Sequence, residues 1–255
     1  MELVDSHCHI NLLDSVETAL AHARASGVKH FLCPGVDLKT TPDVLAVAEK
    51  HSDISASIGI HPNETESISI NDLIKLAAHP KVVALGETGL DYYRLEEHDP
   101  TVQQNNFKHH IHAARELQKP LIIHTRDARE DTIKILKQEK ASEVGGVMHC
   151  FTENWEMAQQ AIDLNFYISF SGIVTFKNAL ELQEIAKKVP LDRMLIETDA
   201  PWLAPMPYRG KPNEPQYVIY VAKKIAELRN EAVEKICVET TANFFTLFKS
   251  AKRTF

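Results

Sequence analysis

The sequence predicts an α/β fold, a single (β/α)8 barrel of the TIM type with extra C-terminal helices. Eight short apolar runs alternate along the chain with longer segments of helical spacing, which is typical of a parallel sheet. The chain has 255 residues, close to the length of about 250 that eight such units need. An open doubly wound sheet usually has a glycine-rich turn after its first strand, and none occurs here. We therefore expect one domain over residues 1–255.

Each expected strand is a short run rich in apolar and β-branched side chains. The runs are Leu3–Cys8, Lys29–Cys33, Ile54–Ile60, Val82–Glu87, Leu121–His124, Val144–His149, Phe166–Phe170 and Met194–Glu197. Because a helical segment separates each run from the next, the strands are expected to be parallel neighbours.

Helical segments fill the gaps between these strands. The first, Ser15–Ala25, places Val16, Ala19, Leu20 and Ala23 on one stripe. The others are Thr41–His51, Asn71–Ala78, Thr101–Leu117, Asp131–Glu139, Trp155–Leu164 and Ala179–Lys188. Three tail segments are expected to be helices packed on the outside of the barrel: Tyr217–Leu228, Glu231–Cys237 and Asn243–Lys249.

The composition excludes several classes of protein. Apolar residues make up 44% and charged residues 25%, close to the globular average, so disorder is excluded. Lys and Arg total 28 and Asp and Glu total 35, which gives a net charge of −7. A uniformly basic nucleic-acid binder is therefore excluded. A nucleic-acid substrate is not, because metal ions and a few local cations can offset the acidic background.

The sequence also predicts a cytoplasmic protein. Residues 1–5 form no basic leader, and no run approaches the roughly 18 apolar residues of a membrane-spanning helix. The four cysteines are widely spaced without a CxxC pair, so we expect free thiols in a reducing compartment. Nothing in the sequence indicates an obligate protein partner.

Two histidines end the first expected strand, in the stretch Asp5-Ser6-His7-Cys8-His9. Residues two apart in a strand point the same way, so His7 and His9 are expected to face the barrel interior together, with Asp5 below them. Two neutral imidazoles side by side can ligate a metal. The alternative is a pair of buried histidines hydrogen-bonded to their neighbours.

Four more side chains that can ligate a metal stand at the ends of other expected strands, where a barrel builds its active site. They are Glu87, His124, His149 and Asp199. With His7 and His9 they make six candidate ligands, more than the three or four that one catalytic zinc takes. A two-metal centre would share them, with one carboxylate bridging ions about 3.5–4 Å apart. The spacing does not choose among Zn, Mn, Mg, Fe and Ni.

These stretches resemble the TatD-type metal-dependent deoxyribonucleases, a family of amidohydrolase-like TIM barrels. The resemblance covers almost the whole chain in the expected order. The matching stretches are DSHCH at 5–9, GIHP at 59–62, GETGLDYY at 86–93, PLIIHTRDA at 120–128, GGVMHCF at 145–151, SGIVTFKNA at 171–179, LIETDAPWLAP with PYRGKPNEP within 195–215, and TTAN at 240–243.

The resemblance implies two divalent metal ions. One would be held by His7, His9, Glu87 and Asp199, and the other by Glu87, His124 and His149. Glu87 would fill the bridging place that a carbamylated lysine often takes in amidohydrolases. After HCF the family commonly continues with Ser-Gly, whereas this chain has Thr152 and Glu153. That departure leaves the ligands untouched and changes the local substrate contacts.

We expect a metal-dependent hydrolase acting on ester bonds, a deoxyribonuclease that trims DNA from an end with a water activated by two metals. Glu87 and Asp199 are the expected catalytic residues. Asp199 either ligates a metal and accepts the proton of the attacking water, or is only a ligand. One alternative is a metallohydrolase of the same architecture acting on an aminoacyl-tRNA ester, a cyclic amide or a similar bond. The other is a metal-binding protein without turnover.

The expected DNA contacts cover a few nucleotides near the metals. Arg126, Arg94 and Arg209 can bind phosphate through a bidentate fork, or they form surface ion pairs instead. The resemblance implies that His61 contacts the substrate. The alternative is that His61 is a structural histidine followed by a turn proline.

Other side chains near the site have two interpretations. Four aromatic residues can stack on bases or only pack the barrel mouth: they are Tyr92, Tyr93, Trp202 and Tyr208. Three histidines of one expected helix are predicted to be solvated rather than ligating, because successive helical residues diverge. They are His109, His110 and His112.

Overall fold

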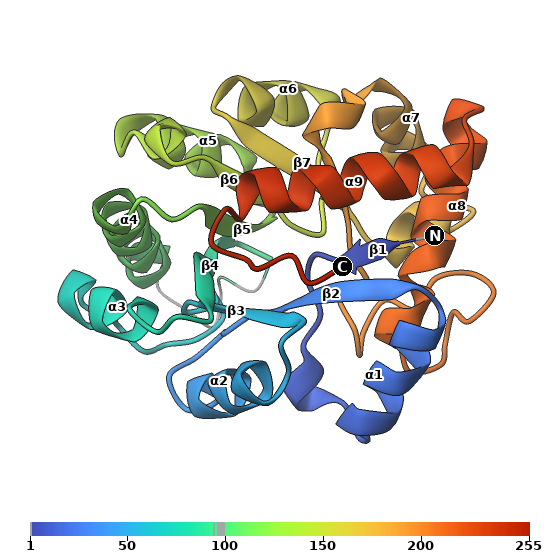
Figure 1. Ribbon diagram of the computed structural model, residues 1–255. Coiled ribbons are helices and arrows are strands. Elements are labelled where there is room, and N and C mark those ends of the chain that lie inside the picture. The colour runs from blue at the N-terminus through green and yellow to red at the C-terminus, as the bar shows by residue number, and fades with distance from the viewer. Residues whose placement is uncertain (1, 94, 96–99) are drawn as a thin grey trace.

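The computed structural model describes residues 2–93, 95 and 100–255, and its fold confirms the predicted (β/α)8 barrel with extra C-terminal helices (Figure 1). Eight parallel strands pair with one another in chain order. They are β1 (Leu3–Asp5), β2 (Val28–Cys33), β3 (Ile54–Ile58), β4 (Val82–Asp91), β5 (Leu121–Arg126), β6 (Gly146–Met148), β7 (Phe166–Phe170) and β8 (Met194–Ile196).

Backbone contacts join the last strand to the first. The N–H of Ser6, directly after β1, donates to the carbonyl oxygen of Ile196 in β8 across 3.1 Å. Just beyond these residues, the N–H of Asp199 donates to the carbonyl oxygen of His7 across 2.9 Å. The chain segments that follow β1 and β8 are therefore held side by side at the carboxyl end of the barrel.

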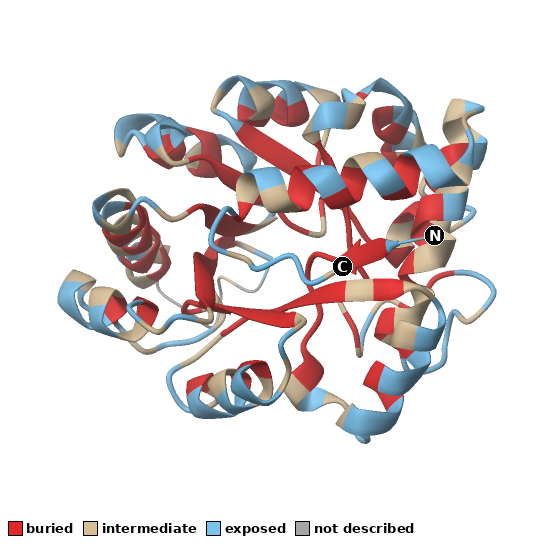
Figure 2. Cartoon of the chain, in the orientation of Figure 1, coloured by how far each residue is buried: buried red, intermediate tan, exposed pale blue. Residues whose placement is uncertain are grey.

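Helices surround the strands, with their apolar faces inward and their outer faces exposed (Figure 2). They are α1 (Val16–Ala25), α2 (Thr41–Lys50), α3 (Ile70–Ala77), α4 (Pro100–Leu117), α5 (Arg129–Gln138), α6 (Trp155–Asp163), α7 (Leu180–Lys188), α8 (Val218–Arg229) and α9 (Val233–Leu247). Side-chain caps begin two of them: the Ser69 hydroxyl accepts from the N–H of Asp72, and the Asn154 side chain accepts from the N–H of Met157. In the described residues no helix has the length and apolar character needed to cross a membrane.

The tail differs from the prediction. The two expected helices at Glu231–Cys237 and Asn243–Lys249 are one continuous helix, α9, because buried hydrogen bonds satisfy polar residues where the two were expected to be separated. The Asn243 amide donates to the carbonyl oxygens of Leu191 and Met194, at 2.8 and 2.9 Å. The Thr240 hydroxyl donates to the carbonyl oxygen of Ile236, at 2.8 Å, within the same helix.

Helix α9 also closes one end of the barrel instead of lying on its outer wall (Figure 1). Phe244 and Phe248 are fully buried and pack in one cluster with the strand residues Val4 and Leu32. The Phe244 ring lies 5.4 Å from that of His30, which stands near the start of β2. The amino-terminal end of the barrel is therefore filled, and the opposite end is left for a site.

Two glycines let β4 lie close against β5. Gly86 and Gly89 have φ angles of +132° and +140°, a region that favours glycine. A Cβ atom at Gly89 would lie 2.0 Å from the carbonyl oxygen of His124. This close approach extends β4 to Asp91, beyond the predicted end at Glu87, and brings Glu87 beside His124.

Candidate metal centre

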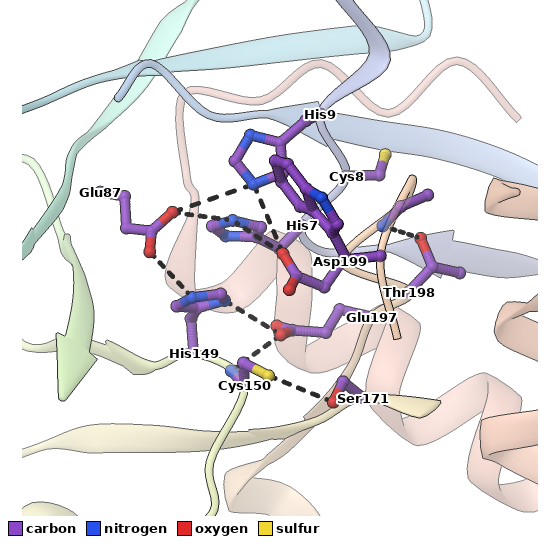
Figure 3. A network of polar contacts seen from close by, with 12 residues as sticks. His7, Cys8, His9, Glu87, His149, Cys150, Ser171, Glu197, Thr198 and Asp199 are labelled. Carbon is purple, nitrogen blue, oxygen red and sulfur yellow. Dashed lines mark hydrogen bonds and ion pairs between the residues drawn. The ribbon is translucent and has the colours of Figure 1, made fainter. Parts of the chain in front are cut away.

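The six candidate ligands converge at the carboxyl end of the barrel, and Figure 3 shows five of them. His7 and His9 follow β1, Glu87 lies in β4 and His124 in β5. His149 and Asp199 follow β6 and β8. A cavity of about 830 Å³ opens over them, and all of the six except the more deeply buried His7 line it.

Glu87 stands at the centre of the cluster. Its Oε1 lies 3.1 Å from Nδ1 of His124 and 3.1 Å from Nε2 of His149. The same oxygen lies 3.3 Å from Nε2 of His61. Its Oε2 lies 3.2 Å from Nε2 of His7. The two oxygens of this buried carboxylate thus face different imidazoles.

Asp199 lies on the side of His7 and His9. Its Oδ1 is 3.4 Å from Nε2 of His9 and 3.7 Å from Nε2 of His7. A φ of +58° at Asp199 turns the chain just after β8. The buried Asp5 accepts hydrogen bonds from the N–H and the hydroxyl of Thr198, at 2.9 and 2.5 Å. Asp5 therefore positions the backbone next to Asp199.

The donor set fits divalent cations. Among the described residues, neither ring nitrogen of His7 has a hydrogen-bond partner, although Nε2 is near Glu87. Nδ1 of His9 also has no hydrogen-bond partner there. Buried polar atoms without partners are unusual in folded proteins, and a metal ion is one explanation. Three groups have ligand atoms within 4.8 Å of one another: His7, His149 and Asp199; His7, His9 and Glu87; and His61, Glu87 and His124.

The charges of the cluster point the same way. Burial by itself would raise the pKa of the Glu87 carboxyl, but His149 and His61 help to hold that pKa well below its usual range. Burial also works against ionisation of Asp199, whose pKa is nevertheless lowered, most strongly by a hydrogen bond from His9. The imidazoles supply the positive charge that compensates the two buried carboxylates here, and bound cations can supply the same compensation.

Glu197 fixes the orientation of His149 (Figure 3). Its Oε1 lies 3.0 Å from Nδ1 of His149 and also accepts from the N–H of Cys150 at 2.7 Å. Its Oε2 accepts from the hydroxyl of Ser169 at 2.5 Å. Burial would lower the pKa of His149, but Glu87 and Glu197 raise it well above its usual value because both ring nitrogens face carboxylates. With a cation bound at Nε2, the remaining ring proton would stay on Nδ1 against Glu197.

Asp91 is a site residue that the sequence analysis missed. Its Oδ2 lies 3.1 Å from Nε2 of His124 and accepts from the Asn63 amide at 3.4 Å. The carboxylate thus holds the ring nitrogen of His124 that faces away from Glu87. The prediction ended the strand at Glu87, which left Asp91 in a turn, although the GLDYY stretch contains it.

The predicted substrate contacts occupy different places. His61 and Arg126 line the same cavity as the candidate ligands. Arg209 is exposed with its guanidinium 4.2 Å from the ring centre of Phe176, and it is not among the residues that line the cavity. Arg94 lies outside the described residues, so its role stays a prediction.

The prediction of three solvated histidines on one helix was wrong for His110. This side chain of α4 is fully buried, with Nδ1 2.6 Å from the carbonyl oxygen of Asn106 and Nε2 accepting from the N–H of Ile60 at 3.1 Å. His109 is partly buried, and Nδ1 of its ring lies 2.7 Å from the carbonyl oxygen of Ile68. His112 is exposed and pairs with Glu139 at 2.8 Å.

Comparisons with known proteins agree on one family. The family described as TatD related DNase matches residues 4–249. A relative in Escherichia coli K12, named uncharacterized metal-dependent hydrolase YcfH, is 49% identical over 255 residues that cover 97% of this chain and 96% of the relative. A relative in Salmonella typhimurium, named 3'-5' ssDNA/RNA exonuclease TatD, is 34% identical over 241 residues, with 91% and 92% covered.

A solved structure agrees with the fold. The crystal structure of YjjV, a TatD homologue from Escherichia coli K12, superposes with a TM-score of 0.89 at 29% sequence identity. The superposition covers 97% of this chain and 98% of that one. The arrangement of strands and helices is therefore shared along the whole barrel.

Proposed function

Because this chain belongs to the TatD related DNase family and is a metal-dependent hydrolase, we propose that it is a deoxyribonuclease that removes nucleotides from an end of a DNA strand. The observation that carries the proposal is the buried Glu87 carboxylate, with imidazole nitrogens of four histidines within 3.3 Å. They are His7, His61, His124 and His149. The Salmonella relative named as an exonuclease supports a nucleic acid as the substrate and an attack from an end.

We propose that Glu87 is shared by two divalent cations. Its Oε2 faces His7, with His9 and Asp199 beside it, and its Oε1 faces His124 and His149. When bound, such cations stabilise the charge of a reacting phosphate and lower the pKa of water. Asp91 and Glu197 hold the outer ring nitrogens of His124 and His149, so both imidazoles stay aimed at the shared carboxylate.

Asp199 is the proposed general base. Its carboxylate is ionised, lines the cavity and is held by its backbone N–H on the chain after β1. A proton taken from the attacking water would therefore go to this carboxylate. General-base catalysis contributes about 10²–10⁴-fold to rate.

His61 and Arg126 are the proposed contacts to the phosphate. Nδ1 of His61 accepts from the N–H of Asn63 at 3.1 Å, so the proton of the neutral ring is on Nε2, which points into the cluster. That N–H faces Oε1 of Glu87 at 3.3 Å, and donating instead to a bound phosphate oxygen is its proposed role. The guanidinium of Arg126 at the cavity wall offers a planar fork for the same group.

An assay with end-labelled single-stranded DNA tests this proposal. The purified protein loaded with Mg²⁺ or Mn²⁺ should produce a ladder of products shortened from one end, and EDTA should abolish it. Charged tRNA and dipeptide-like amides are the comparison substrates. Release of the amino acid or cleavage of the amide without a DNA ladder would favour another hydrolase. Full DNA hydrolysis in excess EDTA, with metal absence confirmed by elemental analysis, would exclude the metal-dependent mechanism.

A further inference from the structure

We propose that the cavity mouth carries two opposed stacking surfaces for unpaired nucleotides, the Trp202 indole on one side and the Tyr93 ring with the Arg126 guanidinium on the other. This inference rests on the proposed nuclease function and names the side chains that select an unpaired strand end. The three side chains are called the stacking residues below.

Trp202 is a large apolar side chain left half exposed, at 50%. It lines the cavity with the candidate ligands, and its ring packs edge-on against that of His9 at 4.9 Å. Its backbone is fixed at two points: its N–H donates to the carbonyl oxygen of Asp199 at 3.0 Å, and its own carbonyl accepts from the buried Asn213 amide at 2.5 Å. The indole is therefore held beside the reacting centre with surface still free for a ligand.

Tyr93 and Arg126 form a second surface. The Tyr93 side chain is 58% exposed, and the guanidinium carbon of Arg126 lies 3.6 Å from its ring centre. The backbone N–H of Tyr93 donates to Asp91 at 3.1 Å, which ties this turn to the end of β4. Guanidinium planes and aromatic rings both stack on unpaired bases.

The two surfaces lie across the mouth from each other. Tyr93 follows β4 and Trp202 follows β8, and strands four apart in a ring of eight are on opposite sides of the barrel. Arg126 and Trp202 both line the cavity of about 830 Å³, whereas Tyr93 lies outside its lining and backs the Arg126 guanidinium. That volume is within the range of sites that enclose a small-molecule ligand. A nucleotide is a ligand of that size, whereas a base still paired in a duplex is not free to enter.

Apart from the proposed cations and the imidazoles of the cluster, the described part of the cavity offers one positively charged side chain, so we expect stacking to supply much of the affinity beyond the reacting phosphate. Among the described residues that line the cavity, Arg126 is the only lysine or arginine, while Glu64, Glu87 and Asp199 are acidic. Each phosphate neutralised on a single strand contributes a slope of about −0.7 to the dependence of log K on log salt. We therefore expect the cavity side chains to contribute the slope of one contact. We also expect little preference for base sequence, because every base has a face that can stack.

A fluorescence titration tests the stacking residues without measuring turnover. The chain has two tryptophans, Trp202 and Trp155. Trp155 lies in α6 with the Lys188 ammonium 5.6 Å from its ring centre, and it does not line the cavity. The ligand is a short oligothymidylate joined by phosphorothioates, which resist hydrolysis, added to the metal-loaded protein. Wild type and Trp155→Phe should show saturable quenching of tryptophan emission.

Affinities of the Trp202 variants are measured by the fluorescence anisotropy of the same oligonucleotide carrying a dye. Trp202→Ala should weaken binding about 5- to 150-fold, the loss of one stacked base. Trp202→Phe should restore most of the affinity. Arg126→Ala should make the salt slope shallower by about 0.7. A blunt duplex of the same length should bind more weakly than the single strand to wild type.

The outcomes separate this inference from the proposed function. Cleavage of DNA by wild type together with unchanged affinity of Trp202→Ala would overturn the stacking role and leave the nuclease function standing. Equal binding of blunt duplex and single strand would also overturn it. Wild type that neither binds the oligonucleotide nor cleaves DNA would refute both.

Discussion

At the scale of single residues, Glu87 differs from the other candidate ligands because each of its oxygens faces its own set of imidazoles. A histidine such as His124 has one nitrogen toward Glu87 and the other toward Asp91, so it belongs to the imidazoles around only one Glu87 oxygen. The consequences of removing either side chain therefore differ in kind.

Glu87→Ala is expected to remove both metal ions, whereas His124→Ala should remove one and keep part of the activity. Elemental analysis of the purified variants gives the ions per chain, and the DNA assay gives turnover. Circular dichroism checks that each variant is folded. Loss of one ion in both variants alike would contradict a shared carboxylate.

Asp199→Asn should keep much of the metal and lose about 10²–10⁴-fold in rate, because asparagine keeps the shape and one oxygen ligand but cannot take up a proton. Metal content and turnover must be measured on the same sample, since the lost charge also weakens metal binding. A fully metallated Asp199→Asn protein with near-native turnover would reduce Asp199 to a ligand.

At the scale of elements, the alternation of strands and helices was predictable from the spacing of apolar residues. Short apolar runs are typical of buried strands, and apolar residues three or four positions apart are typical of helices with one buried face. The errors lie where tertiary contacts override the local pattern. Strand β4 continues through Gly86 and Gly89 because the chain there meets the backbone of β5. Helix α9 continues through Thr240 and Asn243 because their side chains find buried acceptors. The strand that β4 meets and the carbonyl groups that Asn243 binds are both far away in the sequence.

Helix α9 should contribute to stability mainly through its phenylalanines. Phe244 is fully buried, with the Phe248 ring 4.7 Å away, so Phe244→Ala is expected to lower the free energy of unfolding by about 3–5 kcal/mol. Val238 in the same helix is 64% exposed, and Val238→Ala should change the free energy of unfolding by less than about 0.5 kcal/mol. Urea unfolding measures both. If both variants lost a similar amount of unfolding free energy, the packing of α9 against the barrel end would contribute little to stability.

At the scale of the whole molecule, the convergence of the six candidate ligands followed from one rule, that carboxyl ends of parallel strands meet at one end of a barrel. The surroundings of these ligands did not follow from it. Asp91, the Trp202 turn and the place of Arg126 depend on how loops return over the mouth, and no periodicity encodes that path.

Two buried histidines outside the candidate metal centre tie the stability of the fold to pH. Burial lowers the pKa of His30 and of His110 to about 4. His30 lies 2.9 Å from the Ser55 hydroxyl, with Asp53 and Lys81 acting in opposite directions on its pKa. In the unfolded chain both would titrate near pH 6.5, so unfolding takes up protons between pH 6.5 and 4. Their contribution to stability is complete above pH 6.5 and is lost as the pH falls toward 4.

For His110 this loss amounts to about 2 kcal/mol between pH 7 and pH 5. His110→Gln removes the ionisable group, so its free energy of unfolding should fall by about 2 kcal/mol less than that of wild type over this interval. Urea unfolding at the two pH values measures the difference. His22→Gln, at an exposed position of α1, is the control and should follow wild type. The same pH dependence in His110→Gln and wild type would show that His110 is protonated as easily in the fold as out of it.

The hydrogen bond that joins Ser6 to Ile196 has a consequence for synthesis on the ribosome. His9 is translated 190 residues before Asp199 (199 − 9), and at about 5–20 residues per second that separation takes about 10–40 s. During this interval the growing polypeptide contains His7 and His9 but not Asp199, whose carboxylate faces them in the folded protein. A nascent chain is therefore incomplete as a hydrolase until its last strand is made, and ligand assembly is coupled to the final closure of the ring.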